Sequence, residues 1–176
     1  MRKLILLLTL PLFVLDYITK KYIVRHFEAP PGAEDVRRFT YEPESVTVID
    51  GYFDIVRVHN TGVAFGMANG SAWANVVFGG ITIAALGLIW WLYRNNAFPT
   101  KVSRVAVALL LSGIFGNLLD RIFRGYVVDF LHFHYRQEWS WPSFNVADSC
   151  ICIAAALLFI SAFQKAPANP AAEQKA

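Results

Sequence analysis

Four long apolar runs divide the chain. They cover about residues 4–24, 72–93, 105–123 and 146–163. A helix needs about 20 residues to cross the hydrocarbon core of a bilayer. The run at 72–93 meets this requirement without any charge, and the others meet it if their polar ends lie at an interface or inside a bundle. The pattern predicts a mainly α, integral membrane fold built as a four-transmembrane-helix bundle.

The first run has an alternative interpretation as a cleavable signal peptide, because Met1, Arg2 and Lys3 precede its Leu-rich stretch. No small-x-small cleavage site follows Leu15, and the chain continues into a polar segment that begins at Asp16. That continuation suits a retained helix better, so we expect the first run to be a membrane span.

The segment between the first two runs, about residues 25–71, is too long for a simple connector. Within it, 46–49 and 52–58 have strand-like composition and flank an Asp-Gly turn signal. We expect a small extracytoplasmic β-sheet at the membrane surface, with a short periplasmic helix or loop. The segment 164–176 has no apolar periodicity, so residues 1–163 are predicted to be a single membrane-embedded domain followed by a disordered C-terminal tail.

Composition and charge support the membrane assignment. Hydrophobic residues make up 56% of the chain and charged residues only 16%, against about 25% charged residues in an ordinary soluble domain. Arg2 and Lys3 precede the first run and three more basic residues lie within 94–104, which predicts cytoplasmic termini by the positive-inside rule. The excess of 16 basic over 13 acidic residues is small and scattered, so no nucleic acid partner is expected.

Polar side chains concentrate in four places in or beside the runs, where lipid makes them costly. Two are local pairs with ordinary structural explanations. Asp16 and Lys20 have the spacing of a helical ion pair, and Asn145 and Asp148 have the spacing of a capping box that opens the fourth run. The third place is a polar turn formed by His59, Asn60, Thr61 and Gly62. The fourth is one stripe of a helix, which carries Asn117, Asp120, Arg121 and Arg124.

Two aspartates suggest chemistry when they are considered together. Asp129 follows the third run in an apolar, extended-looking segment, and Asp148 begins the fourth run. Singly, Asp129 has an ordinary explanation as a capping or salt-bridged carboxylate, with Arg121 or Arg124 as a candidate partner, and Asp148 is explained by helix capping. Together they belong to the same membrane face, and packing of neighbouring spans would let them converge. Two close carboxylates share a proton, so one can activate a water while the other protonates a leaving group, which indicates peptide hydrolysis.

A metal site is the competing interpretation, because Asp129, His132 and His134 are closely spaced. In an extended segment the two histidines share a face while the aspartate points to the other face. Further zinc-site patterns are absent from the sequence, so neither a metal nor a cofactor is predicted. Cys150 and Cys152 lie on different faces of a helix and are expected to be small buried hydrophobes.

Five short motifs in this order resemble lipoprotein signal peptidase, also called signal peptidase II. The resemblance extends over about residues 4–163. The motifs are Asp16-x-x-x-Lys20, Asn60-Thr61-Gly62-x-Ala64-Phe65, Gly116-Asn117-x-x-Asp120-Arg121, Val127-Val128-Asp129-Phe130 and Phe144-Asn145-x-Ala147-Asp148-Ser149.

This resemblance implies an aspartic endopeptidase of the bacterial inner membrane with its active site at the periplasmic face. The implied substrates are prolipoproteins that carry diacylglyceryl-Cys, cut just before that Cys, and the implied inhibitors are cyclic peptides of the globomycin type. Membrane lipid is the other expected partner, and a monomer is expected. The catalytic positions fall on Asp129 and Asp148. The supporting or substrate-binding positions fall on Asp16, Lys20, Asn60, Gly62, Asn117, Asp120, Arg121 and Asn145.

Two other functions remain open at this point. One is a small transporter or channel that uses the acidic residues as a proton or cation path. The other is a non-enzymatic assembly factor in which the acids merely form ion pairs. The stretch 28–45 is longer than the resemblance would suggest, which leaves the shape of the surface sheet open.

Overall fold

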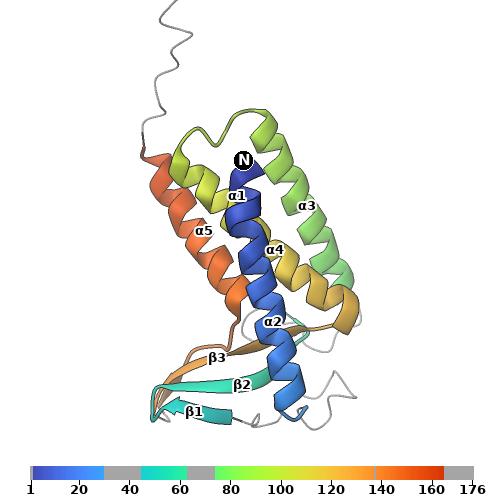
Figure 1. Ribbon diagram of the computed structural model, residues 1–176, viewed down its shortest axis with the longest axis vertical. Coiled ribbons are helices and arrows are strands. Elements are labelled where there is room, and N and C mark those ends of the chain that lie inside the picture. The colour runs from blue at the N-terminus through green and yellow to red at the C-terminus, as the bar shows by residue number, and fades with distance from the viewer. Residues whose placement is uncertain (1, 30–44, 63–73, 137, 165–176) are drawn as a thin grey trace, which may run out of the picture.

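The computed structural model describes residues 2–29, 45–62, 74–136 and 138–164 (Figure 1). The helices are α1 (Arg2–Leu4), α2 (Leu10–His26), α3 (Ala74–Arg94), α4 (Lys101–Arg124) and α5 (Val146–Ala162), and a π-helical segment, Ile5–Thr9, joins α1 to α2. The strands are β1 (Ser45–Ile49), β2 (Phe53–Asn60), β3 (Val127–Tyr135) and β4 (Trp139–Ser140).

The helices follow the four apolar runs, with one clear difference in their bounds. α4 begins at Lys101, four residues before the predicted start at 105. The reason is a capping box, in which Thr100 Oγ1 accepts the Ser103 N–H at 3.0 Å and Ser103 Oγ accepts the Thr100 N–H at 3.2 Å. Gly125 ends the helix in the left-handed conformation, with φ of +79°. Residues 72–73, and residues 165–176 of the tail predicted at 164–176, lie outside the described residues.

Two helices in the described part of the chain are long and apolar enough to cross a bilayer, Val76–Arg94 and Lys101–Arg124. α5 is apolar but has 17 residues, and α2 buries the polar pair Asp16 and Lys20. Large apolar side chains such as Leu7 are exposed on the helices. The molecule is therefore helix-rich with an apolar helical surface, as a membrane protein requires.

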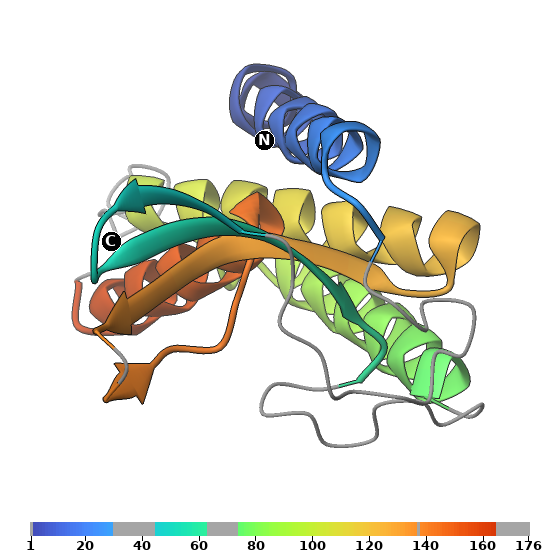
Figure 2. The same ribbon diagram turned by 90° about the horizontal axis from the view of Figure 1, so that it is seen from below.

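The strands form one antiparallel sheet in the order β1-β2-β3-β4, which lies across one end of the helices (Figures 1 and 2). The predicted hairpin is confirmed, with Gly51 at a φ of +76° in the turn. The prediction that the sheet lies within about 25–71 is wrong, because β3 and β4 add strands from beyond α4. β3 pairs with β2 so that Asp129 is opposite Val58, which makes the sheet part of the site.

Three helices meet closely where α5 begins. A Cβ added to Gly116 of α4 would lie 2.5 Å from Asp16 Oδ2 of α2 and 3.0 Å from Ala147 Cβ of α5. Farther along, Cys150 is buried between α4 and α5, as predicted. The same prediction is wrong for Cys152, which is exposed because it points from α5 away from the neighbouring helices.

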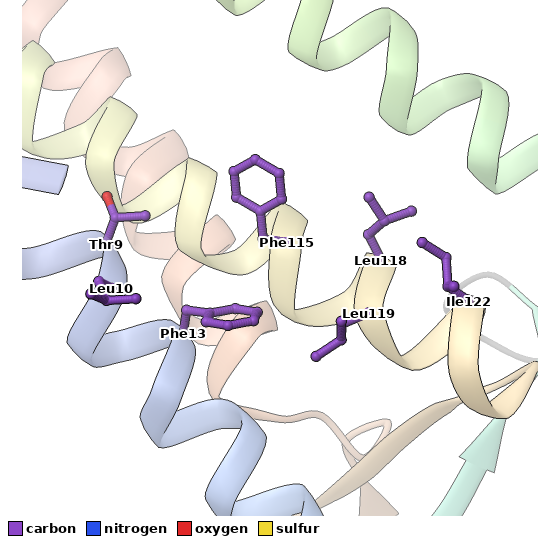
Figure 3. A pocket seen from close by; sticks show the side chains of 7 residues that line it. All are labelled: Thr9, Leu10, Phe13, Phe115, Leu118, Leu119 and Ile122. Atoms are coloured by element: carbon purple, nitrogen blue, oxygen red, sulfur yellow. The ribbon is translucent and has the colours of Figure 1, made fainter. Parts of the chain in front are cut away.

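A groove of about 290 Å³ lies between α2 and α4, and Figure 3 shows the side chains that line it. Its lining is apolar apart from one hydroxyl, and no charged side chain faces it, so it offers no catalytic group. The lining residues are Thr9, Leu10, Phe13, Phe115, Leu118, Leu119 and Ile122.

Candidate active site

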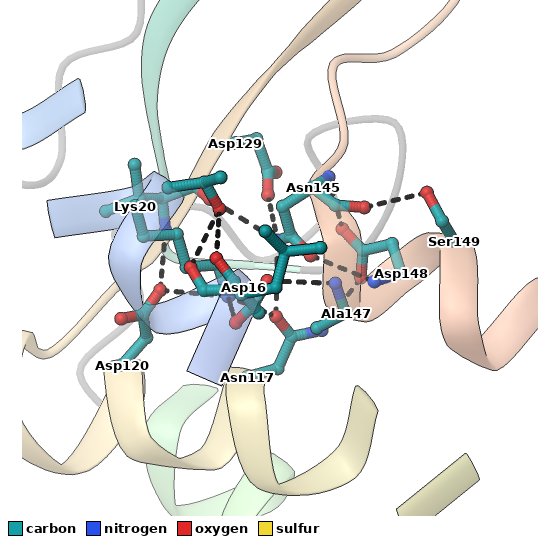
Figure 4. Close-up of polar contacts among 12 residues, drawn as sticks. Asp16, Lys20, Asn117, Asp120, Asp129, Asn145, Ala147, Asp148 and Ser149 are labelled. Carbon is teal, nitrogen blue, oxygen red and sulfur yellow. Dashed lines mark hydrogen bonds and ion pairs between the residues drawn. The ribbon is translucent and has the colours of Figure 1, made fainter. Parts of the chain in front are cut away.

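Asp129 and Asp148 converge at the junction of the sheet with α5 (Figure 4). Asp129 is on β3 and Asp148 is in the first turn of α5, and each of their four carboxylate oxygens accepts one N–H. Asp129 Oδ2 accepts from Asn60 Nδ2 at 2.9 Å and its Oδ1 from Asn145 Nδ2 at 2.7 Å. Asp148 Oδ1 accepts from Asn117 Nδ2 at 2.7 Å.

Asn145 joins the two aspartates directly. Its side chain donates to Asp129, and its backbone N–H donates to Asp148 Oδ2 at 3.1 Å. In return, Asn145 Oδ1 accepts the Asp148 backbone N–H at 2.9 Å, which completes the predicted capping box. A residue that the sequence assigned to helix capping therefore also bridges the dyad.

Gly62 acts on the dyad through Asn60. The Gly62 backbone N–H donates to Asn60 Oδ1 at 3.0 Å, so the amide nitrogen of Asn60 is the end that faces Asp129. The rest of the predicted turn motif, Ala64 and Phe65, lies outside the described residues.

A second layer of buried charge supports this arrangement. Lys20 Nζ lies 2.8 Å from Asp16 Oδ2 and 3.2 Å from Asp120 Oδ2, and it donates to Asn117 Oδ1 at 3.0 Å. The predicted ion pair of Asp16 with Lys20 is confirmed. The four acids of the site are thus gathered in one network instead of being spread through the depth of the helices, as an ion path would require.

The arginines of the helical stripe have other partners than Asp129, so the salt-bridge alternative for Asp129 does not hold. Arg124 pairs with Asp120, four residues earlier on α4. Arg121 lies over the ring of Phe78 on α3, with 4.5 Å between the guanidinium carbon and the ring centroid. Its Nε is buried without a hydrogen-bond partner among the described residues.

The family described as signal peptidase (SPase) II matches residues 8–164, nearly nine-tenths of the chain. The chain belongs to the signal peptidase II family. It is 36% identical to the lipoprotein signal peptidase of Pseudoalteromonas atlantica over 158 residues, which cover 89% of this chain and 87% of that protein. It is 35% identical to the lipoprotein signal peptidase of Syntrophotalea carbinolica over 159 residues, covering 90% of each.

A solved structure described as a bacterial membrane enzyme has the same fold. It matches with a TM-score of 0.70 and 26% identity over 94% of each chain. As a member of the signal peptidase II family, the chain is an aspartic peptidase of a bacterial membrane.

The surroundings of Asp129 change the pKa of its carboxyl group. Burial, reinforced by the negative charge of Asp148, raises the pKa of Asp129 to about 7. The amides of Asn60 and Asn145 act in the opposite direction but do not cancel this rise. The carboxyl group is therefore able to keep a proton near neutral pH.

The histidines of the alternative metal interpretation belong to a separate cluster. His132 and His134 share a face of β3, with 5.4 Å between their ring centroids, and His134 Nε2 lies 3.1 Å from Asp54 Oδ2. Within the described ranges, no three His, Cys, Asp or Glu side chains are arranged to hold a metal ion. Asp129 is instead joined to Asp148 through Asn145.

Proposed function

We propose that this enzyme removes signal peptides from prolipoproteins that carry diacylglyceryl-Cys, cutting just before that Cys with a water activated between Asp129 and Asp148. The convergence of these two carboxylates, joined by Asn145, carries the proposal. Each of the four carboxylate oxygens accepts an N–H, so the same network holds both groups in place.

The two aspartates have different roles in this mechanism. Asp148 lies at the N-terminus of α5, where the helix dipole stabilises a carboxylate, so it is the base. Asp129 is 2% exposed and has a pKa of about 7, so it holds the shared proton. Such coupled groups titrate as a pair, and the active form of the dyad carries one proton.

The proton movements balance over the two steps of hydrolysis. Asp148 takes a proton from the water while the water oxygen attacks the scissile carbonyl carbon. At the same time Asp129 gives its proton to the carbonyl oxygen. In the second step Asp148 donates a proton to the leaving amine of the Cys, and Asp129 recovers one from the tetrahedral diol. The peptide bond breaks and both carboxyl groups return to their starting states.

The remaining predicted residues hold the dyad or the substrate. Asn60, Asn117 and Asn145 keep the carboxyl groups in place, with Gly62 orienting Asn60. Arg121 binds a backbone carbonyl or a lipid ester oxygen of the substrate; its buried Nε has no hydrogen-bond partner among the described residues. Asp16, Lys20 and Asp120 form the supporting ion-pair layer.

The proposed setting is a bacterial inner membrane, crossed four times by a monomer with both termini in the cytoplasm. The first span is α1 to α2, and the others are α3, α4 and α5. Exposed apolar side chains on all four support this, among them Leu7, Val76, Phe123 and Phe159. The sheet then lies at the periplasmic surface and carries the active site there.

The decisive test is cleavage of a synthetic precursor peptide that bears diacylglyceryl-Cys by the purified protein. We expect one cut before the Cys, and loss of at least about 10³-fold in kcat in Asp129→Asn and in Asp148→Asn. Asp54→Asn is the matched control, because Asp54 is on the same sheet but contacts His134 instead of the dyad. Near-normal cleavage by either dyad variant would remove that residue from the mechanism. Inhibition by a globomycin-type cyclic peptide is also expected.

A further inference from the structure

Lys20 is at the centre of the polar network, yet its hydrogen bonds and ion pairs within the described residues reach neither dyad aspartate. Its side chain is 1% exposed. An ammonium group has three N–H donors, and three acceptors surround this one: Asp16 Oδ2, Asp120 Oδ2 and Asn117 Oδ1. The three close polar partners of Lys20 therefore lie on α2 and α4.

The two acids that Lys20 holds fix the backbone immediately before each dyad residue. Asp16 Oδ1 accepts the N–H of Ala147 at 2.9 Å, and Ala147 precedes Asp148. Asp120 Oδ2 accepts the N–H of Val128 at 3.1 Å, and Val128 precedes Asp129. The distance between the start of α5 and the start of β3 therefore depends on the distance between Asp16 and Asp120. Lys20 sets that distance because it bridges them.

The third acceptor is Asn117, and its contact with Lys20 fixes which end of its side-chain amide faces Asp148. Asn117 Oδ1 accepts from Lys20 Nζ and also from Asn145 Nδ2 at 3.2 Å. Its amide nitrogen is consequently the end that faces Asp148. A reversed amide would oppose N–H groups to the ammonium and oxygen to the carboxylate, and both contacts are repulsive.

We propose that Lys20 is a positioning residue that sets the separation and orientation of the catalytic aspartates through its three acceptors. This inference rests on the proposed function of the dyad and names what holds the dyad together. The alternatives are that Lys20 acts only by its charge across space, or only by keeping the fold intact.

Two substitutions separate these alternatives in the full-length enzyme in detergent. Lys20→Met keeps the length of the side chain and removes the donors and the charge. Lys20→Arg keeps the charge, but its planar, forked donors cannot meet three acceptors arranged around one point. Lys21→Met is the matched control, because the adjacent Lys21 lies over the Tyr17 ring and away from the network.

The first measurement follows both aspartate carboxyl groups directly by carbon-13 NMR during a pH titration. Carboxylates that move apart repel each other less. In both Lys20 variants the midpoints of the two ionisation steps should therefore lie closer together, by about half a pH unit or more. Arg121 remains in every variant and contributes equally. An unchanged interval, with both ionisations displaced together, would overturn the proposal in favour of charge alone.

The second measurement is cleavage of the lipidated peptide, with rates corrected for the folded fraction from thermal unfolding. We expect kcat to fall about 100-fold in Lys20→Met and at least about tenfold in Lys20→Arg, with KM changed less than about threefold. Recovery of kcat in Lys20→Arg, or a normal corrected kcat in Lys20→Met, would overturn the proposal. Absence of cleavage by the unaltered enzyme would instead refute the proposed function, and the NMR titration would still decide the role of Lys20.

Discussion

Gly116 is the position at which the smallest change should have the largest effect. An added Cβ would lie 2.5 Å from Asp16 Oδ2, closer than real Cβ atoms approach a neighbour, and 3.0 Å from Ala147 Cβ. Asp16 has no room to retreat, because one oxygen pairs with Lys20 at 2.8 Å and the other accepts the Ala147 N–H at 2.9 Å. Gly116→Ala must therefore break one of these contacts or separate α4 from α5.

The expected cost follows from the groups that would lose their partners. Alanine gains about 1 kcal/mol over glycine in helix propensity. Disrupting a buried ion pair costs about 3–5 kcal/mol, because it leaves a buried charge uncompensated. The net loss in the free energy of unfolding should be about 2–4 kcal/mol, which lowers Tm by roughly 5–15 °C for a chain of this size.

The assay compares thermal unfolding and peptide cleavage in detergent for Gly116→Ala and for Gly87→Ala, its matched control on α3. A Cβ at Gly87 would meet nothing within 4 Å, so its Tm should stay the same or rise slightly. We expect kcat of the folded fraction to fall in Gly116→Ala, because Asp16 fixes the residue before Asp148. A Tm equal to that of the unaltered enzyme would refute the packing argument, and an unchanged kcat would refute the link from Asp16 to Asp148.

Four further outcomes are expected. Cleavage should decline as pH rises through about 7, because Asp129 then loses the shared proton, and a kcat that stays constant to pH 9 would contradict its role as acid. Burial, with the charge of Arg57, lowers the pKa of His59 to about 4. Its neutral form is favoured by folding, so about 1–3 kcal/mol of stability present above pH 6.5 should be lost as pH falls through 4, and His59→Gln should flatten this dependence of Tm on pH. Asn60→Ala should reduce kcat at least about tenfold with little change in KM, since Asp129 loses a donor. Thr100→Ala should lower the free energy of unfolding by about 1 kcal/mol, seen as a lower Tm, and leave kcat unchanged, because it removes only a helix cap far from the dyad.

The features that sequence predicted well are local ones. The hairpin about Asp50 and Gly51, the ion pair of Asp16 with Lys20 and the capping box of Asn145 with Asp148 each depend on residues within a few positions of one another. Their geometry follows from strand and helix periodicity alone.

The contacts that sequence reasoning missed join distant segments. Asp16 is 131 positions from Ala147, and Asn60 is 69 positions from Asp129. Both contacts depend on the register of β3 against β2 and on the close approach of helices at Gly116, which no periodicity encodes. The resemblance to a family points to these residues, but not to the bonds among them.

The salt-bridge alternative for Asp129 fails for a local reason, and its failure has a consequence for the mechanism. Arg124 is four residues after Asp120 on the same helix, and this helical spacing was the signal that should have assigned it there. An arginine paired with Asp129 would lower the pKa of its carboxyl group and leave it unable to carry a proton at neutral pH. The enzyme surrounds Asp129 with the neutral amides of Asn60 and Asn145 instead. Such donors fix its position without adding a positive charge, so burial can still raise its pKa. The same logic predicts that Asn60→Lys, which replaces a neutral donor by a cation, should shift the alkaline decline of kcat to lower pH, and a shift to higher pH would contradict it.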